Sequence, residues 1–443
     1  MQRDSLAILI LAMGGHCLGA VSTNVPLDHW SYGAIEKLAD YGLIDSAMPG
    51  TKPFSRIEMA RMIDAAHTHA LEQGREGPIV QALLDRLTEE FSHEMNRTGA
   101  YAWAVRQDFI KPIEDPYVRL VYGADPFDLE NQAGDLFEEG VNTRIGFASR
   151  INLFDRFAAY LHPEFEDPST TDSGIELIEG YGKAQVGDWE VEAGKDSMWW
   201  GPGHHGSMLM GNNAKNLTLL KVSNPQPIQL PWVLGHLGPF KGVFFLSQLE
   251  EGRQDAPKAK FTGVRLSSKP FPWLEIGGSR TIQFGGDGMP DIGVDDYLQV
   301  FWPKNLQGTE NQLAALDASM WMPLPTWVPA RSLKAYVEYA GEDAAGFRTY
   351  RPLLGLQLND LLRTGRTDLR VEYAETSDLF YVHSIYTDGY TYDDRVMGHH
   401  MGTNAEDLFL RVTHYLSADL VLGVDADRQQ YGSGGAVQPT IYQ

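Results

Sequence analysis

One short segment, MWWGPGHHGSMLMGNNA at 198–214, carries residues suited to three different chemistries. Trp199 and Trp200 offer flat apolar faces to a sugar ring. His204 and His205 are candidate ligands of zinc or copper. The same segment also fits G-x-G-x-x-G, the pattern of a dinucleotide-binding loop, through Gly201, Gly203 and Gly206.

A dinucleotide site requires its glycine loop to open an amphipathic helix within a βαβ unit. The residues that follow, SMLMGNNAKNLTLLKVSNPQPIQLPW, contain three prolines and no sustained helical pattern. Pro202 stiffens the motif itself, and an exported chain meets no nicotinamide cofactor. We therefore interpret the glycine pattern as accidental and expect neither nucleotide nor cofactor.

A metal site would draw on a second histidine pair, His399 and His400, which lies in the similar context MGHHMG. Adjacent residues of an extended chain point to opposite faces, so at most one imidazole of each pair serves easily as a ligand. Neither pair is accompanied by a nearby cysteine or by H-x-x-x-H spacing. The sequence therefore predicts no metal.

The chain begins like an exported protein. Arg3 precedes an apolar run from Leu6 to Ala12, and small residues follow, so we predict a secretory signal peptide over residues 1–22. The only cysteine lies within it, which leaves the exported chain without a disulfide framework. Further along, no stretch of about 18 apolar residues is present. A membrane-spanning form would therefore have to be a closed β-barrel.

Three helical patterns occupy residues 23–98, which we predict to form a helical module. The first runs from Trp30 to Leu38, and Gly42 supplies a left-handed stop. The second opens with a capping box, S-x-x-E at 55–58. The third begins at Pro78 and carries one apolar face.

Residues 25–67, VPLDHWSYGAIEKLADYGLID…KPFSRIEMARMIDAA, resemble one S-layer-homology unit. The likeness lies in the Pro-x-x-His-Trp opening and the Arg-x-Glu of the second helix. Such units commonly hold the wall in envelope proteins, so the resemblance implies peptidoglycan or a wall polymer as a further partner. Simple packing of the bundle beneath another domain is the alternative.

From Tyr101 onward the hydrophobic period changes from 3.6 to 2. The segments DWEVEAGK (188–195), LKAYVEYA (333–340) and DLRVEYAE (368–375) each alternate apolar with mostly charged residues. Loops rich in glycine, aspartate and asparagine separate them. We predict that residues 99–443 form a large closed antiparallel transmembrane β-barrel, with a soluble sandwich or propeller as the alternative.

Four stretches resemble the Wzi family of outer-membrane capsule-assembly proteins. They are GKDSMWWGPGHHGSMLMGNNA (194–214), FTGVRLSSKPFPWLEIGGSRTIQFGGDG (261–288), NQLAALDASMWMPLP (311–325) and YTDGYTYDDRVMGHHMGTNAEDLFL (386–410). The resemblance implies an outer-membrane barrel of about eighteen strands, set in lipid, with periplasmic helices at its base. It also implies a lectin-like, non-catalytic role that holds capsular or exopolysaccharide at the cell surface.

The residues themselves suit a sugar ligand. The tryptophan indoles can stack and donate N–H, and His204, Asn212, Asn213 and Tyr390 can exchange hydrogen bonds with hydroxyl groups. Cations for uronate or phosphate groups are Lys215, Lys221, Arg280, Arg363, Arg366 and Arg395. In the alternative interpretation the tryptophans belong to an aromatic girdle or a packed plug, and the asparagines satisfy loop backbone.

The net charge of the chain limits the ligands that it can bind. A formal net charge of −23 argues against nucleic acid, and it makes capture of an anionic polymer depend on a local basic and aromatic patch. A channel for small solutes is the main rival. An enzyme acting on glycans is a third possibility, but acidic pairs such as Glu164 and Glu166 are expected by chance among 59 acidic residues. We expect a non-enzymatic binding protein of the outer membrane.

Overall fold

The computed structural model describes residues 21–73, 77–98, 108–290, 310–342 and 350–432. Most of the predicted signal peptide and Tyr101, where we placed the change of period, lie outside these residues. The first described residues, Val21 and Ser22, are buried. Four helices come first: α1 (Ser31–Asp40), α2 (Arg56–Gln73), α3 (Pro78–Glu90) and α4 (Ser92–Thr98).

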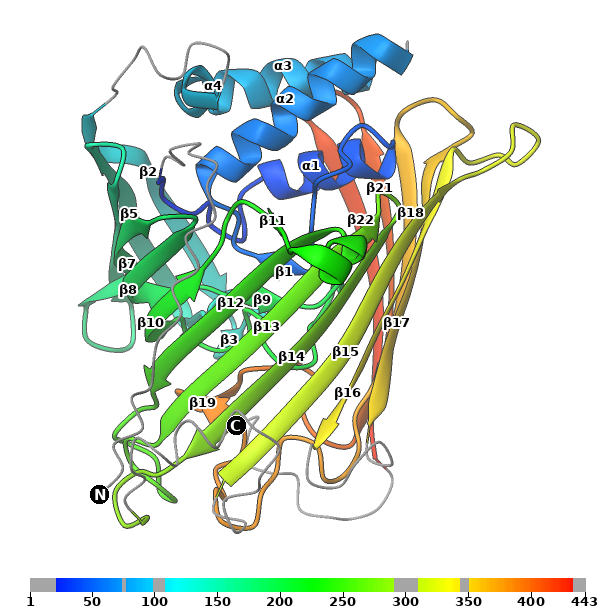
Figure 1. Cartoon of the computed structure of the whole chain (residues 1–443). Helices are drawn as coiled ribbons and strands as arrows, with labels where there is room; N and C mark the ends of the chain where they lie inside the picture. Colours follow the sequence, from blue (N-terminus) through cyan, green and yellow to red (C-terminus); the bar gives the residue numbers. More distant parts are fainter. Residues whose placement is uncertain (1–20, 74–76, 99–107, 291–309, 343–349, 433–443) are drawn as a thin grey trace, which may run out of the picture.

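The described residues then form a sixteen-stranded antiparallel sheet in which nearly every strand pairs with its neighbours in the chain. Figure 1 shows this sheet curving into a wall around a central space, the lumen. Its strands are β2 (Phe109–Gly123), β5 (Gly140–Leu153), β6 (Phe157–Pro168), β7 (Gly174–Val186), β8 (Trp189–Asp196), β10 (Leu217–Ser223), β11 (Ile228–Gln229), β12 (Pro239–Gln248), β13 (Lys260–Phe271), β14 (Leu274–Phe284), β15 (Glu310–Pro323), β16 (Ser332–Glu342), β17 (Arg351–Leu361), β18 (Thr367–Glu375), β21 (Ala405–Tyr415) and β22 (Val421–Tyr431).

Three short strand pairs and one 3₁₀ helix complete the described elements. The pairs are β1 (Thr51–Lys52) with β9 (Trp199–Trp200), β3 (Phe127–Asp128) with β4 (Leu136–Phe137), and β19 (Thr391–Tyr392) with β20 (Arg395–Val396). The 3₁₀ helix is η2 (Trp232–Leu237). Among the described residues, no helix combines the length and the apolar character needed to cross a membrane.

The helix signals in the sequence are confirmed locally. Gly42 follows α1 with a φ of 72°, the left-handed conformation that ends a helix. The Ser55 N–H donates to the Glu58 carboxylate at 2.8 Å, and the Glu58 N–H donates to Ser55 Oγ at 3.3 Å, which completes the capping box. Pro78 opens α3.

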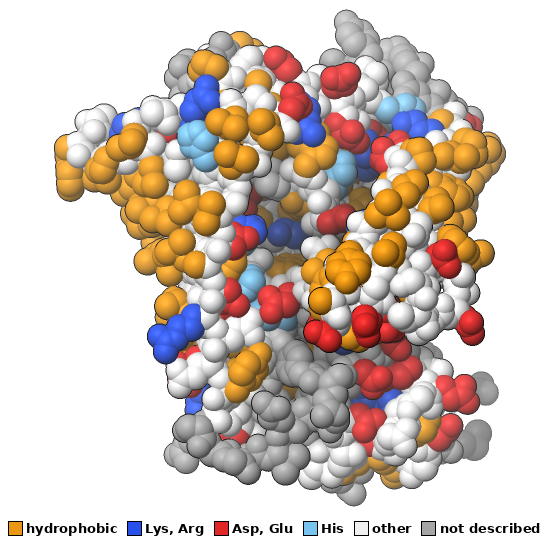
Figure 2. Space-filling model, turned by 180° about the vertical axis from the view of Figure 1, so that it is seen from behind, with side chains coloured by type: hydrophobic (Ala, Val, Ile, Leu, Met, Phe, Trp, Pro, Cys, Tyr) orange, Lys and Arg blue, Asp and Glu red, His pale blue; other side chains and the backbone are white. Residues whose placement is uncertain are grey.

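The strands place ionisable side chains toward the lumen and apolar side chains outward. In β18, Asp368, Arg370 and Glu372 are buried, whereas Val371 between them is exposed. The same alternation buries Lys334, Tyr336 and Glu338 of β16. Figure 2 shows apolar side chains spread over the outer surface of the wall. This arrangement reverses that of a soluble protein and is typical of a wall that faces lipid.

The sheet differs from the predicted closed barrel of about eighteen strands. Among the described residues no pairing joins its first strand, β2, to its last, β22. Pro112 and Pro116 of β2 have no N–H, and the ladder to β5 is irregular between Lys111 and Tyr117. Prolines of this kind belong to edge strands, so closure and full strand number stay predictions.

Connections alternate between two ends of the wall. At one end, the turn end, hairpins are as short as two residues, at 187–188 and 272–273. At the other, the loop end, the connections include long segments at 124–139, 197–216 and 376–404. Helices α2, α3 and α4 lie over the turn end (Figure 1). There the Arg86 guanidinium donates to the Ala418 carbonyl oxygen at 2.7 Å.

Helix α1, the start of α2 and the segment between them are held against the inner wall by ion pairs and hydrogen bonds. Lys37 Nζ lies 2.7 Å from the Asp368 carboxylate, and Lys241 Nζ lies 2.6 Å from that of Glu58. Arg265 of β13 donates to Thr51 Oγ1 at 2.8 Å. The N-terminal module therefore reaches into the lumen instead of only resting on its rim.

Candidate functional site

The connection 197–216 contains the two tryptophans and the first histidine pair. It folds from the loop end into the lumen, and we call it the lumenal loop. There Trp199 and Trp200 of β9 pair with Lys52 and Thr51 of β1, so two parts of the chain far apart in sequence form one small sheet. The element that follows is strand β10. This agrees with our expectation, based on the prolines, that no helix follows the glycine pattern. The glycine pattern thus forms the corner of the lumenal loop.

Two buried carboxylates of the wall hold the backbone of this loop. The Glu372 carboxylate accepts hydrogen bonds from the backbone N–H groups of His204, at 2.7 Å, and His205, at 2.9 Å. The Glu338 carboxylate accepts from the Met208 N–H at 3.3 Å. A Cβ at Gly201, where φ is 110°, would lie 2.4 Å from this carboxylate, so the close approach requires glycine.

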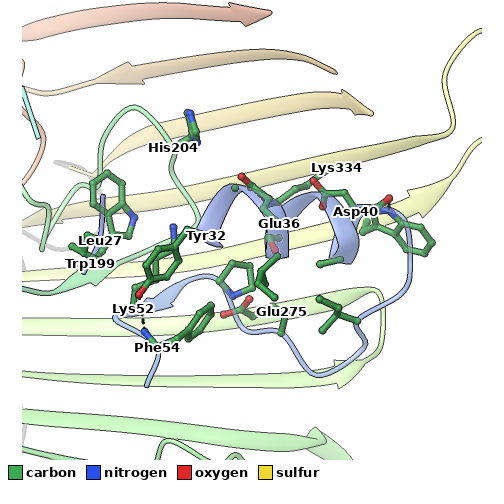
Figure 3. A pocket seen from close by; sticks show the side chains of 18 of the residues that line it. Leu27, Tyr32, Glu36, Asp40, Lys52, Phe54, Trp199, His204, Glu275 and Lys334 are labelled. Carbon is green, nitrogen blue, oxygen red and sulfur yellow. Dashed lines mark hydrogen bonds and ion pairs between the residues drawn. The ribbon is translucent and has the colours of Figure 1, made fainter. Parts of the chain in front are cut away.

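The two tryptophans have different surroundings. Trp200 is 1% exposed and belongs to an apolar cluster with Met208, Met210 and Phe245. Trp199 instead lines a cavity of about 460 Å³ between the N-terminal module, the lumenal loop and the wall (Figure 3). Its Nε1 has no hydrogen-bond partner among the described residues. Nε1 of Trp200 is likewise buried without a partner in the described part of the chain, so what distinguishes Trp199 is its position at the border of the cavity.

The cavity combines aromatic side chains with polar and charged ones. A Lys52 ammonium lies 5.7 Å from the centroid of the Trp199 ring and 5.5 Å from that of Tyr32. His204 and Asn212, both predicted site residues, also line it. Other aromatic, polar and charged lining residues include Asp28, His29, Trp30, Glu36, Asp40, Asp45, Phe54, Asn131, Gln132, Lys269, Trp273, Glu275, Trp321, Lys334 and Arg411.

The charged side chains around the cavity differ in their ion-pair partners. Glu36 lies 2.6 Å from Lys334 and 2.9 Å from Arg370, and although burial opposes it, these cations hold the pKa of its carboxyl well below the usual range. Lys52 forms no ion pair within 4.0 Å with any described residue. Burial lowers the pKa of its ammonium to about 8. The sequence did not predict Lys52 as a site residue, because only its pairing opposite Trp199 brings it to the cavity.

Five predicted residues, Asn212 among them, form other contacts at the loop end. Asn212 Nδ2 donates to the Asn131 carbonyl at 3.2 Å, and Asn213 Nδ2 donates to the Val396 carbonyl at 3.1 Å. Both therefore satisfy loop backbone, as one interpretation of the sequence expected. Tyr390 is buried and donates to Thr281 Oγ1 at 2.8 Å. The remaining two form ion pairs, Lys215 with Glu176 and Asp393, and Arg395 with Asp128.

The other four predicted cations are not brought to the cavity. Arg363 and Arg366 lie in the connection between β17 and β18 at the turn end, where they donate to carbonyl oxygens of neighbouring turns. Lys221 pairs with Glu192 at 2.8 Å inside the wall. Arg280 contacts the Gln312 side chain. None of the four joins Trp199.

The histidine pairs come together, contrary to our expectation from extended geometry. His399 and His400 lie in a turn, so their rings stack with centroids 4.5 Å apart instead of pointing to opposite faces. Both face Asp407 of β21, and His205 approaches the same carboxylate. Burial, together with the nearby His400, lowers the pKa of His205 to about 4. His204 diverges toward Arg411, 2.7 Å away.

Comparison with known proteins identifies the architecture. The chain superimposes on Wzi of Escherichia coli, described as an outer-membrane protein involved in group 1 capsule assembly and a carbohydrate-binding β-barrel. The TM-score is 0.69 at 21% identity, over 93% of this chain and 86% of that one. Pseudomonas putida OprB at high pH gives a TM-score of only 0.37 at 9% identity, over 73% and 88%.

Sequence comparison agrees. An uncharacterised 55.8 kDa protein in the cps region of Klebsiella pneumoniae is 30% identical over 173 residues, 38% of this chain. The match spans only a third of that relative's length, 33%. The family model of the capsule assembly protein Wzi matches residues 122–442, which is most of the chain. The protein belongs to the Wzi capsule assembly family.

Proposed function

We propose that this protein is an outer-membrane β-barrel that binds capsular or exopolysaccharide at the cell surface. Its relative in Escherichia coli is described as a carbohydrate-binding barrel involved in capsule assembly, and the present chain belongs to the same family. The binding is non-enzymatic in this proposal. Outward apolar side chains would contact outer-membrane lipid, and the long connections of the loop end would face the cell exterior.

The cavity beside Trp199 is the observation that carries the proposal. It brings together the Trp199 indole ring and, beside it, a lysine ammonium without a carboxylate partner among the described residues. A pyranose packs its C–H surface on an aromatic ring, and a uronate supplies the anion that Lys52 lacks. The volume of about 460 Å³ falls within the range of small-molecule sites. We infer that the cavity holds an acidic sugar unit.

In this proposal the N-terminal module packs onto the turn end of the wall and lies on the periplasmic side. Short turns occur at the periplasmic end of outer-membrane barrels, and the helices cover the turn end. The residues that carry the S-layer-homology resemblance are used inside the protein: Glu58 pairs with Lys241, and Arg56 pairs with Glu94 at 3.0 Å. Binding of peptidoglycan or a wall polymer through residues 25–67 stays a prediction.

Replacing Trp199 with alanine should weaken polysaccharide retention about tenfold, because an aromatic platform contributes on the order of 1 kcal/mol or more. Cell-surface polysaccharide per cell measures the effect, and a heat-modifiability gel reports folding. Trp327→Ala is the matched control, since Trp327 is 83% exposed in a turn-end connection. Full retention by a folded Trp199→Ala protein would place the binding surface elsewhere.

Binding of an acidic oligosaccharide should weaken by up to about tenfold between pH 7 and pH 9. Lys52 is protonated below its pKa of about 8 and loses its charge as the pH rises through that value. Titration calorimetry with a uronate-containing oligosaccharide measures the change, and a neutral oligosaccharide is the control. Lys52→Met should abolish the pH dependence. A dependence that survives this substitution would show that Lys52 is not the cation involved.

A further inference from the structure

Three imidazoles and one carboxylate converge at the loop end, outside the cavity described above. Asp407 Oδ2 lies 3.3 Å from His400 Nε2, 3.7 Å from His205 Nε2 and 3.9 Å from His399 Nε2. Asp407, His399 and His400 are each at most 2% exposed. Glu130 approaches from the open side, with its Oε2 3.4 Å from His400 Nε2 and 3.8 Å from His205 Nε2.

The polar atoms of this cluster lack good hydrogen bonds. Nε2 of all three histidines and both carboxylate oxygens of Asp407 are without a hydrogen-bond partner among the described residues. Their mutual distances exceed the roughly 2.7–2.9 Å of a charge-assisted hydrogen bond. A carboxylate buried without partners is strongly unfavourable, so the arrangement calls for a bound cation.

The spacing matches the coordination sphere of a first-row divalent metal. Ligand atoms about 2.1 Å from a tetrahedral ion lie about 3.4 Å from one another. We propose that His205, His400 and Asp407 bind one divalent transition-metal ion, best matched by zinc. Glu130 and Asp427, whose carboxylates lie within 4.8 Å of His205 and His400, adjoin the ion on its open side. Imidazole and carboxylate donors without thiolate suit zinc in this geometry. The proposal replaces our sequence-based expectation of no metal.

Surrounding residues orient the ligands. The His205 ring stacks on Phe409 of β21, with centroids 3.9 Å apart and planes 8° from parallel. The Met401 N–H approaches Nδ1 of His399 at 3.4 Å, and Nε2 of His399 lies farther from Asp407, at 3.9 Å, than the Nε2 atoms of His400 and His205 do. His399 is therefore a positioning residue for the carboxylate and not a ligand. Asp427 of β22, 3.9 Å from His205 Nε2, lies beside the open side.

The ion would fasten separate parts of the loop end to one another. Its three ligands come from the lumenal loop, the 376–404 connection and strand β21, and Glu130 of the 124–139 connection adjoins them. Without it, these segments would meet around an unsatisfied carboxylate. We therefore assign the ion a structural role that keeps the lumenal loop folded, independent of which polymer the protein binds.

The test uses the full-length protein without a histidine tag, purified in detergent. After dialysis against chelator, zinc is added back and binding is measured by calorimetry and by elemental analysis. We expect about one zinc per chain, and at least tenfold weaker binding for His400→Ala and for the near-isosteric Asp407→Asn. His236→Ala, which changes an exposed histidine of η2, should bind zinc as the unmodified protein does.

A second readout separates the metal site from simple misfolding. In the unmodified protein, hydrogen exchange of residues 201–214 should slow at least tenfold when zinc replaces chelator, whereas that of α3 should not change. Binding near one equivalent together with this protection would support the proposal. The proposal is overturned if the folded, chelated protein fails to take up one equivalent of zinc, or if Asp407→Asn and His400→Ala bind it with unchanged affinity.

Discussion

Replacing Trp200 with alanine should destabilise the lumenal loop by about 3–5 kcal/mol, the usual range for truncating a buried tryptophan. The indole packs against Phe245 with ring centroids 5.5 Å apart, and a Cβ at Gly263 would lie only 2.9 Å from its Cη2 atom. The space is therefore shaped to this ring. Hydrogen exchange of residues 201–214 in detergent-solubilised protein measures the change.

The comparison with Trp199→Ala makes this result diagnostic. Trp199 lines an existing cavity, so its truncation enlarges that cavity and should destabilise the loop far less. We expect Trp200→Ala to loosen the loop and Trp199→Ala to weaken binding while the loop stays protected. Equal effects of the two substitutions on exchange would contradict the assignment of Trp200 to the core.

The unmodified protein should show no measurable conductance in a planar bilayer, and Glu36→Lys should open it. Glu36 of α1 pairs with Lys334 and Arg370, and removing one partner of a buried ion pair costs about 3–5 kcal/mol. A lysine there would face two cations, so α1 should leave the lumen. Single-channel recording measures the opening.

Glu89→Lys is the matched control for this change, because Glu89 is exposed on α3 and the change in net charge is the same. It should stay closed. Conductance of an open pore in the unmodified protein would favour a channel for small solutes over a polysaccharide-binding protein. If folded Glu36→Lys stays closed, α1 does not seal the lumen.

Much of the fold could be predicted because its signals are local. The capping box at Ser55 and Glu58 and the stop at Gly42 depend on neighbouring residues only. Strand alternation likewise assigned Lys334 and Val337 to opposite faces of β16 before any partner was known. Edge irregularity was not predicted, although Pro112 and Pro116 of β2 indicate it.

The site was harder to predict because its contacts are not local. Arg363 and Arg366 lie at the turn end because every hairpin reverses the chain, and a count of strands after β9 would have placed them there. The pairing of Lys52 with Trp199 joins segments almost 150 residues apart and has no motif. His399 and His400 escaped prediction because their geometry is that of a turn, not a strand.

The contacts of α1 and α3 with the wall also bear on the order of assembly. Lys37 and Asp368 are 331 residues apart, and Arg86 and Ala418 are 332 apart. The module is synthesised first, yet its partners belong to the last strands. Contacts of such high sequence separation form late, since the loop-closure entropy must be overcome beforehand. We therefore expect the N-terminal helices to dock late, after the strands that hold their partners have formed.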